Sequence, residues 1–148
     1  MEAFIIRPFG TKNDIDFEKV EQELIRPALL EVGITAVNTG NILEAGNIRQ
    51  DIFQLLLTAD VVIADISIHN ANVFYELGIR HALREKLTFL IRTKKDDVPF
   101  DLKTDSYLSY DYPNVSKQKE KLSRSISASL NSEQQDSPVY LMLPMLKS

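Results

Sequence analysis

Two carboxylates bracket a polar turn near the middle of the chain. The segment ADVVIADISIHNANVFYELG, residues 59–78, runs from an apolar stretch through a polar turn into a pattern with helical spacing. Asp65 ends the apolar stretch, and Glu76 lies among the apolar residues of the predicted helix. Because a desolvated carboxylate is costly, each needs bonding partners or a functional role. The structural alternatives are a surface ion pair between Glu76 and Arg80, four residues on, and a turn-bonding role for Asp65.

Further polar residues are expected to meet these carboxylates in one crevice. In an open parallel sheet, ligands bind outside the carboxyl ends of the strands, where the strand order reverses. The pattern of strands and helices predicts the strand order 2-1-3-4-5, in which that point lies between the first and third strands. The loops RPFGTKND and ISIHNAN should therefore converge there. Besides Asp65 and Glu76, these loops and the helix after them supply the candidate substrate-binding residues Arg7, Phe9, Gly10, Ser67, Asn70 and Asn72.

Arg49 is a candidate phosphate contact outside these loops. It lies in the first turn of a predicted helix that follows Gly46, where helix-terminal amides and a guanidinium could together bind an anion. The alternative is an ordinary solvated residue of the first helical turn.

The usual nucleotide and metal motifs are absent from the sequence. There is no G-x-G-x-x-G and no Walker A lysine motif, so any nucleotide must be held differently. The two histidines, His69 and His81, have no carboxylates at a repeated ligand spacing, and we predict no metal site and no resident cofactor. Ser67 and His69 are too close along one strand end to be read as a nucleophile and its base.

Apolar runs that alternate with helical patterns position these residues. We expect strands at 3–6, 34–37, 61–66, 88–91 and 107–110, and helices near 17–32, 47–56, 71–84 and 114–130. Expected helix starts are Asp14 or Asp16, Asn47 with Gln50 as a capping box, and Asn70. Pro27 should kink or split the first helix. The pattern predicts an α/β fold: a doubly wound, mostly parallel five-stranded sheet in the flavodoxin-like order 2-1-3-4-5, with helices on both faces.

The overall composition suits one globular domain. The chain has 148 residues, of which 44% are hydrophobic and 26% are charged. A net charge of −4 disfavours nucleic acid as a partner, and no apolar run is long enough to cross a membrane. The absence of cysteine and of a signal-peptide pattern favours the cytoplasm. We expect a domain over 1–131, followed by a linker and apolar tail over 132–148 that docks on this domain, on a second copy or on a following domain.

The segment ADVVIADISIHNANVFYELGIRHAL resembles the signature of the nucleoside 2-deoxyribosyltransferase-like group, which is close in fold to Toll/interleukin-1 receptor (TIR) domains. FIIRPFG, at the start, is similar to the first strand and loop of bacterial TIR-like domains. The resemblance covers about residues 3–112 and implies cleavage of an N-glycosidic bond. It implies that Glu76 is the catalytic carboxylate and that Asp65 holds or protonates the substrate. The chain has Asp65-Ile66-Ser67 where deoxyribosyltransferases have Asp-Gly, which argues against base exchange between deoxynucleosides.

The chemistry of the leaving group narrows the choice of substrate. Cleavage of a ribosyl C1′–N bond builds oxocarbenium character on the sugar, which a nearby carboxylate stabilises. Nicotinamide leaves NAD as a neutral molecule and needs no general acid, whereas a purine or pyrimidine usually does. The leading prediction is therefore hydrolysis of a nucleotide, with NAD as substrate rather than cofactor. The alternatives are a non-catalytic TIR-like module that binds a nucleotide signal or a protein, and a deoxynucleoside monophosphate N-glycosidase or deoxyribosyltransferase.

Overall fold

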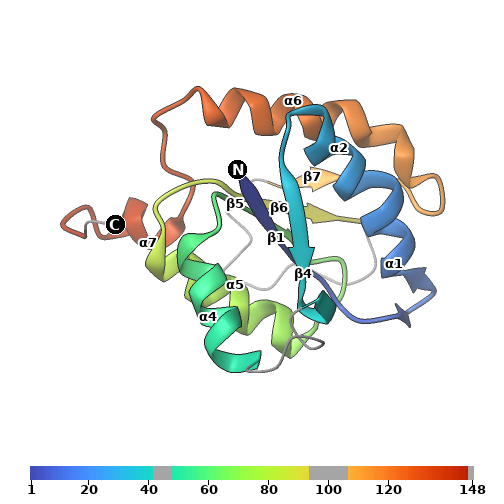
Figure 1. Ribbon diagram of the computed structural model, residues 1–148, viewed down its shortest axis with the longest axis horizontal. Helices are drawn as coiled ribbons and strands as arrows, with labels where there is room; N and C mark the ends of the chain where they lie inside the picture. Colours follow the sequence, from blue (N-terminus) through green and yellow to red (C-terminus); the bar gives the residue numbers. More distant parts are fainter. Residues whose placement is uncertain (42–47, 94–106, 147–148) are drawn as a thin grey trace.

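A five-stranded parallel sheet forms the centre of the molecule (Figure 1). The computed structural model describes residues 1–41, 48–93 and 107–146. The strand order is β4-β1-β5-β6-β7, and each neighbouring pair is parallel, which confirms the predicted order 2-1-3-4-5. The strands are β1 (Glu2–Ile6), β4 (Thr35–Asn38), β5 (Val61–Asp65), β6 (Thr88–Arg92) and β7 (Leu108–Ser109).

Helices cover both faces of this sheet, because the central strands are apolar on both sides. Along β1, Ala3 and Ile5 join one core cluster, while Phe4 and Ile6 join the other. The first cluster is covered by the N-terminal helix and α6 (Lys119–Leu130), and the second by α4 (Ile48–Thr58) and α5 (Ala71–Leu83). Figure 1 shows these two helical layers on opposite sides of the strands.

The N-terminal helix is irregular near Pro27, as expected. It consists of α1 (Phe17–Val20), a π-helical turn (Glu21–Ile25) and α2 (Arg26–Glu31). A proline has no N–H to donate to the preceding turn, and a wider turn before it accommodates the missing bond without ending the helix. Of the two predicted caps, Asp16 is used: its Oδ1 accepts from the amides of Glu18 and Lys19 at 3.1 and 3.3 Å.

Several short elements were not predicted. A two-stranded hairpin, β2 (Thr11–Lys12) and β3 (Ile15–Asp16), lies in the first loop, and its turn residues Asn13 and Asp14 have φ of 52° and 65°. Asn and Asp tolerate this left-handed region better than most residues, so a tight turn can form without glycine. A 3-10 helix (Val115–Gln118) precedes α6, and β7 has two residues instead of four. Asn47 of the proposed capping box lies outside the described residues.

The C-terminal segment returns to the domain. Ser137 Oγ donates to the carbonyl of His81 at 2.6 Å, and the helix α7 (Pro138–Met142) packs against α5. Tyr140 is buried, and its hydroxyl lies 3.2 Å from the carbonyl of Ala82. The predicted tail thus docks in part on its own chain, while other apolar residues stay exposed: Leu141, Met142, Leu143, Met145 and Leu146.

No helix in the described parts of the chain has the length and apolar character needed to span a membrane.

Candidate functional site

A cavity of about 260 Å³ lies at the carboxyl ends of β1 and β4, against the layer formed by α4 and α5. Its walls come from two strand-end loops and from the first two turns of the two helices. The cavity lies on the side of the sheet at which parallel α/β folds bind ligands, but at the ends of β1 and β4 rather than between the first and third strands, β1 and β5, as predicted. The lining residues are Phe9, Thr39, Arg49, Ile52, Phe53, Asn72, Tyr75 and Glu76. Four of the predicted site residues are therefore brought together: Phe9, Arg49, Asn72 and Glu76.

Glu76 is the most unusual group in this cavity. Its Oε2 atom is buried and has no hydrogen-bond partner among the described residues. Desolvation by burial raises the pKa of Glu76 to about 7. A carboxyl group that titrates near neutral pH in a cavity is typical of functional sites.

The predicted structural alternative for Glu76 is not realised. Arg80, four residues later, is fully buried and turns away from the cavity. Its guanidinium donates to the carbonyls of Leu56 and Ala59 at 3.1 and 2.8 Å, and to Thr88 Oγ1 at 3.1 Å. Arg80 thus binds the carbonyls at the end of α4, where a cation is favourable, instead of pairing with Glu76.

Three aromatic rings surround the cavity. Phe9 comes from the loop after β1, Phe53 from α4 and Tyr75 from α5, and their exposed fractions are 45%, 37% and 63%. Only Phe9 was predicted. Phe53 follows Arg49 by one helical turn and Tyr75 precedes Glu76, so sequence spacing could have identified both once the cavity-facing sides of the helices were known. Exposed aromatic faces suit the stacking of a flat ring.

Arg49 and Asn72 provide the polar part of the lining. Both are exposed and lie in the first turns of α4 and α5, respectively. Asn70, in contrast, is not among the lining residues. Its Oδ1 accepts from the amide of Val73 at 3.1 Å and caps α5, as the sequence predicted for helix initiation.

Asp65 lies outside this cavity. It is 1% exposed, and its carboxylate accepts from the amide and hydroxyl of Ser67 at 2.9 and 2.6 Å and from the Tyr110 hydroxyl at 2.7 Å. Burial raises the pKa of Asp65 despite these bonds. Ser67 is also buried, and its Oγ accepts from the amide of Thr93 at 2.8 Å. Asp65 and Ser67 therefore join the ends of β5, β6 and β7, and the geometry favours the turn-bonding role for Asp65.

Arg7 and Gly10 are also absent from the cavity lining. The Arg7 guanidinium bonds to Glu21 and Glu18 at 2.8 and 2.6 Å, so it is occupied by carboxylates rather than free for a phosphate. Gly10 has a φ of 64°, and its carbonyl accepts from the amide of Phe17 at 3.1 Å. Its contribution is the turn that closes the first loop.

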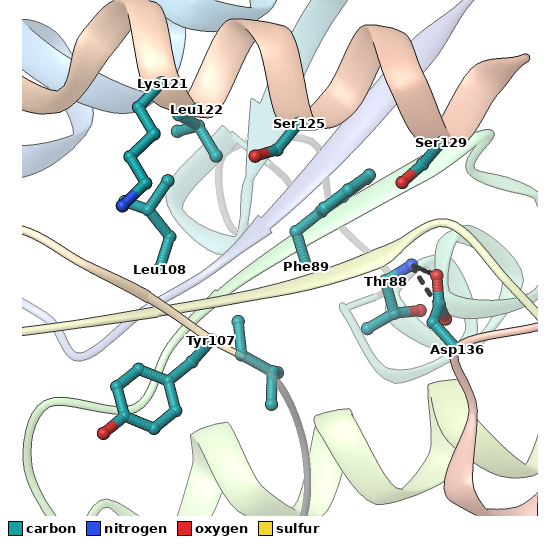
Figure 2. A pocket seen from close by; sticks show the side chains of 10 residues that line it. Thr88, Phe89, Tyr107, Leu108, Lys121, Leu122, Ser125, Ser129 and Asp136 are labelled. Atoms are coloured by element: carbon teal, nitrogen blue, oxygen red, sulfur yellow. Dashed lines mark hydrogen bonds between the residues drawn. The ribbon is translucent and has the colours of Figure 1, made fainter.

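A second cavity, of about 290 Å³, lies between α6 and the strands β6 and β7. Figure 2 shows Ser125 and Ser129 of α6 facing Phe89 across it, with Asp136 at one end. Asp136 accepts from the amides of Leu87 and Thr88 at 2.7 and 3.3 Å, and burial raises its pKa to about 6. None of the predicted site residues lines this cavity, and its carboxylate is already bonded. We therefore place the candidate site in the first cavity.

No group of three or more His, Asp or Glu residues in the described segments is arranged to hold a metal ion.

Comparisons with known proteins support the fold alone. No protein-family model and no curated protein matches the sequence. A flavodoxin-like domain from Synechococcus sp. is similar in structure, with a TM-score of 0.51 and 12% identity over 88% of this chain and 97% of that domain. A lysine decarboxylase from Francisella novicida has a TM-score of 0.57 and 12% identity over 88% of this chain. This chain spans 18% of the length of that enzyme. The resemblance to deoxyribosyltransferase-like and TIR-like proteins stays a prediction.

Proposed function

We propose that this protein hydrolyses the N-glycosidic bond of a nucleotide with a cationic leaving group, and that NAD is the substrate. The observation that carries the proposal is the buried Oε2 of Glu76, which has no hydrogen-bond partner in the described part of the chain, in a cavity lined by three aromatic rings. Such rings attract a flat cation through their faces, and an unpaired carboxylate stabilises positive charge at close range.

The proposed reaction needs one ionised carboxylate. The C1′–N bond breaks, and its electron pair moves to the pyridinium nitrogen, so nicotinamide leaves as a neutral molecule. Glu76 stabilises the positive charge that develops on the ribose. Water then adds to C1′ and releases a proton to solvent. Because the leaving group needs no proton, the burial of Asp65 does not prevent the reaction.

The size and the lining of the cavity indicate which parts of NAD it would hold. A volume of about 260 Å³ is slightly below the usual range of about 300–1,000 Å³ for ligand pockets, so the cavity suits the nicotinamide and its ribose rather than the whole dinucleotide. Phe9, Phe53 and Tyr75 would contact the ring, and Asn72 would contact the ribose hydroxyls. Arg49, which is exposed at the cavity, would contact the phosphates. We place the activity in the cytoplasm, in keeping with the absence of cysteine from the sequence.

A second candidate function follows from the protonation of Glu76. With a pKa of about 7, a substantial fraction of Glu76 is neutral at physiological pH. A neutral carboxyl could donate a proton to a nucleobase, which would suit a deoxynucleoside monophosphate N-glycosidase. The two reactions differ in substrate and in the protonation state that they require.

A substrate panel tests both candidates. NAD and the four deoxynucleoside monophosphates are incubated with wild type, Glu76→Gln, Asp65→Asn and Glu120→Gln, and free base is measured by chromatography. We expect nicotinamide release that falls about 10²-fold or more in Glu76→Gln, since the charge is lost while the shape is kept. Glu120→Gln, an exposed carboxylate of α6, is the matched control and should leave release unchanged.

Other outcomes of the panel have defined meanings. Nucleobase release from the monophosphates alone would support the second candidate. No release of any base, with NAD still bound in a calorimetric titration, would identify the protein as a nucleotide-binding module without catalysis. Undiminished release by a folded Glu76→Gln protein would remove Glu76 from the mechanism.

A further inference from the structure

Glu21 is a buried carboxylate on the opposite helical layer from the cavity. It lies in the π-helical turn of the N-terminal helix, and its side chain is 1% exposed. It accepts from Arg7 Nε at 2.8 Å, from Arg26 Nε at 2.7 Å and from Asn38 Nδ2 at 2.9 and 3.0 Å. Burial raises the pKa of Glu21, but the hydrogen bonds from Asn38, Arg7 and Arg26 outweigh it and hold the pKa below its ordinary value. Glu21 is therefore a charged centre with several donors around it.

Two of the three residues that donate to Glu21, Arg7 and Asn38, come from the two chain segments that form one side of the cavity. Arg7 follows β1, and its Nη1 donates to the carbonyl of Pro8 at 3.0 Å, next to the cavity residue Phe9. Asn38 is the last residue of β4 and precedes the cavity residue Thr39. A single carboxylate thus connects the backbone before Phe9 with the backbone before Thr39.

Three further hydrogen bonds hold the end of β4 in place. Arg26 Nη1 donates to the carbonyl of Ala36 at 2.8 Å. The amide of Asn38 donates to Asn41 Oδ1 at 2.9 Å, and the amide of Asn41 donates to Asn38 Oδ1 at 3.0 Å. The end of β4 is therefore held both toward Glu21 and along its own loop.

We propose that Glu21 is a positioning residue. It sets the distance between two walls of the candidate site: the loop after β1, which carries Phe9, and the end of β4, which is followed by Thr39. Its charge matters as well as its shape, because it brings together two guanidinium groups that repel each other without it. Glu21 touches no ligand and acts through Arg7 and Asn38. The effect on turnover rests on the proposed function, whereas the effect on the geometry of the cavity does not.

The chain offers a matched control for Glu21. Glu18 binds the same guanidinium, with its Oε2 2.6 Å from Arg7 Nη2, but its side chain is 59% exposed and has no bond to β4. The chain contains no tryptophan, so Phe9→Trp creates a single fluorescent reporter in the cavity. Tyr140→Trp provides a second reporter, on α7, outside this network.

The experiment combines Glu21→Gln or Glu18→Gln with each reporter. In the ligand-free protein, we expect Glu21→Gln to shift the emission maximum and acrylamide quenching of the Phe9→Trp reporter and to leave the Tyr140→Trp reporter unchanged. Glu18→Gln should change neither. Without a reporter, Glu21→Gln should raise KM for NAD about tenfold or more and change kcat less, because misplaced walls weaken substrate positioning.

Each outcome is informative. Unchanged Phe9→Trp fluorescence in a folded Glu21→Gln protein overturns the proposal, and so does an equal change in both reporters. If Glu21→Gln does not fold, Asn38→Ala takes its place. This change removes the direct bonds between Glu21 and β4, while Glu21 keeps both arginines and Arg26 keeps its bond to Ala36. Asn38→Ala must shift the Phe9→Trp reporter for the proposal to stand. If wild type releases no nicotinamide, the proposed function fails while the fluorescence comparison still decides the role of Glu21.

Discussion

At the scale of single residues, the protonation of Glu76 gives a prediction with a definite sign. Burial raises its pKa from an ordinary value of 4.5 to about 7, so the folded state binds this proton more tightly than the unfolded state. The resulting stabilisation is complete below pH 4.5 and is lost as the pH rises to about 7. Relative to wild type, Glu76→Gln should therefore be more stable at pH 8, by at most about 3 kcal/mol, and similar in stability at pH 4. Thermal melts at pH 4 and pH 8 measure this difference, with Glu120→Gln as the control.

The ionisation of Glu76 should also determine how the activity depends on pH. If the carboxylate stabilises an oxocarbenium ion, kcat/KM for NAD should rise with pH through about 7, whereas a general acid would give a fall over the same range. A pH profile that is flat between 5.5 and 8.5 would contradict both roles.

At the scale of elements, two asparagines at the start of α5 have different positions: one caps the helix and the other lines the cavity. Asn70 caps the helix through its bond to the Val73 amide, while Asn72 is exposed and lines the cavity. Asn70→Ala should cost about 1 kcal/mol and lower Tm by about 2–4 °C. Asn72→Ala should change Tm little and weaken the binding of NAD, as measured by titration calorimetry. Equal losses of stability in the two variants would contradict this division.

At the scale of the whole molecule, the C-terminal segment has two different surfaces. Tyr140 is buried against α5, while Leu141, Met142 and Met145 are exposed. Deleting residues 138–148 should lower Tm by several degrees, since burial of one large side chain contributes about 1.5–3 kcal/mol. Replacing Leu141 and Met142 with serine should leave Tm nearly unchanged. If that double variant alters the mass measured by light scattering, the exposed residues form a contact between copies; the same mass would assign the tail to intrachain docking.

The sequence by itself determined the fold and one part of the site. Continuous apolar runs predicted β1 and β5, and helical spacing predicted α4 and α5, because these patterns reflect which faces a chain must bury. The strand order followed from the alternation of strands and helices. With the order known, the carboxyl ends of the strands indicated the side of the sheet on which Phe9, Asn72 and Glu76 lie. The sequence placed the crevice between β1 and β5, whereas the cavity lies at the ends of β1 and β4 and also includes Arg49.

Only the tertiary structure decided which polar residues are already bonded. Arg7 and Asp65 lie in the expected loops, but their hydrogen-bond partners are distant in sequence. Glu21 lies 14 residues from Arg7, and Tyr110 lies 45 residues from Asp65. Phe53 and Tyr75 became part of the site only when the packing of α4 and α5 fixed which sides of these helices face the cavity. The local pattern of apolar and polar residues shows which faces of a helix or strand are buried. The hydrogen-bond partners of a side chain depend instead on how elements that are distant in sequence pack together. For that reason the sequence alone could identify candidate carboxylates but could not distinguish them. Asp65 accepts three hydrogen bonds, whereas Glu76 has a buried oxygen without a partner among the described residues.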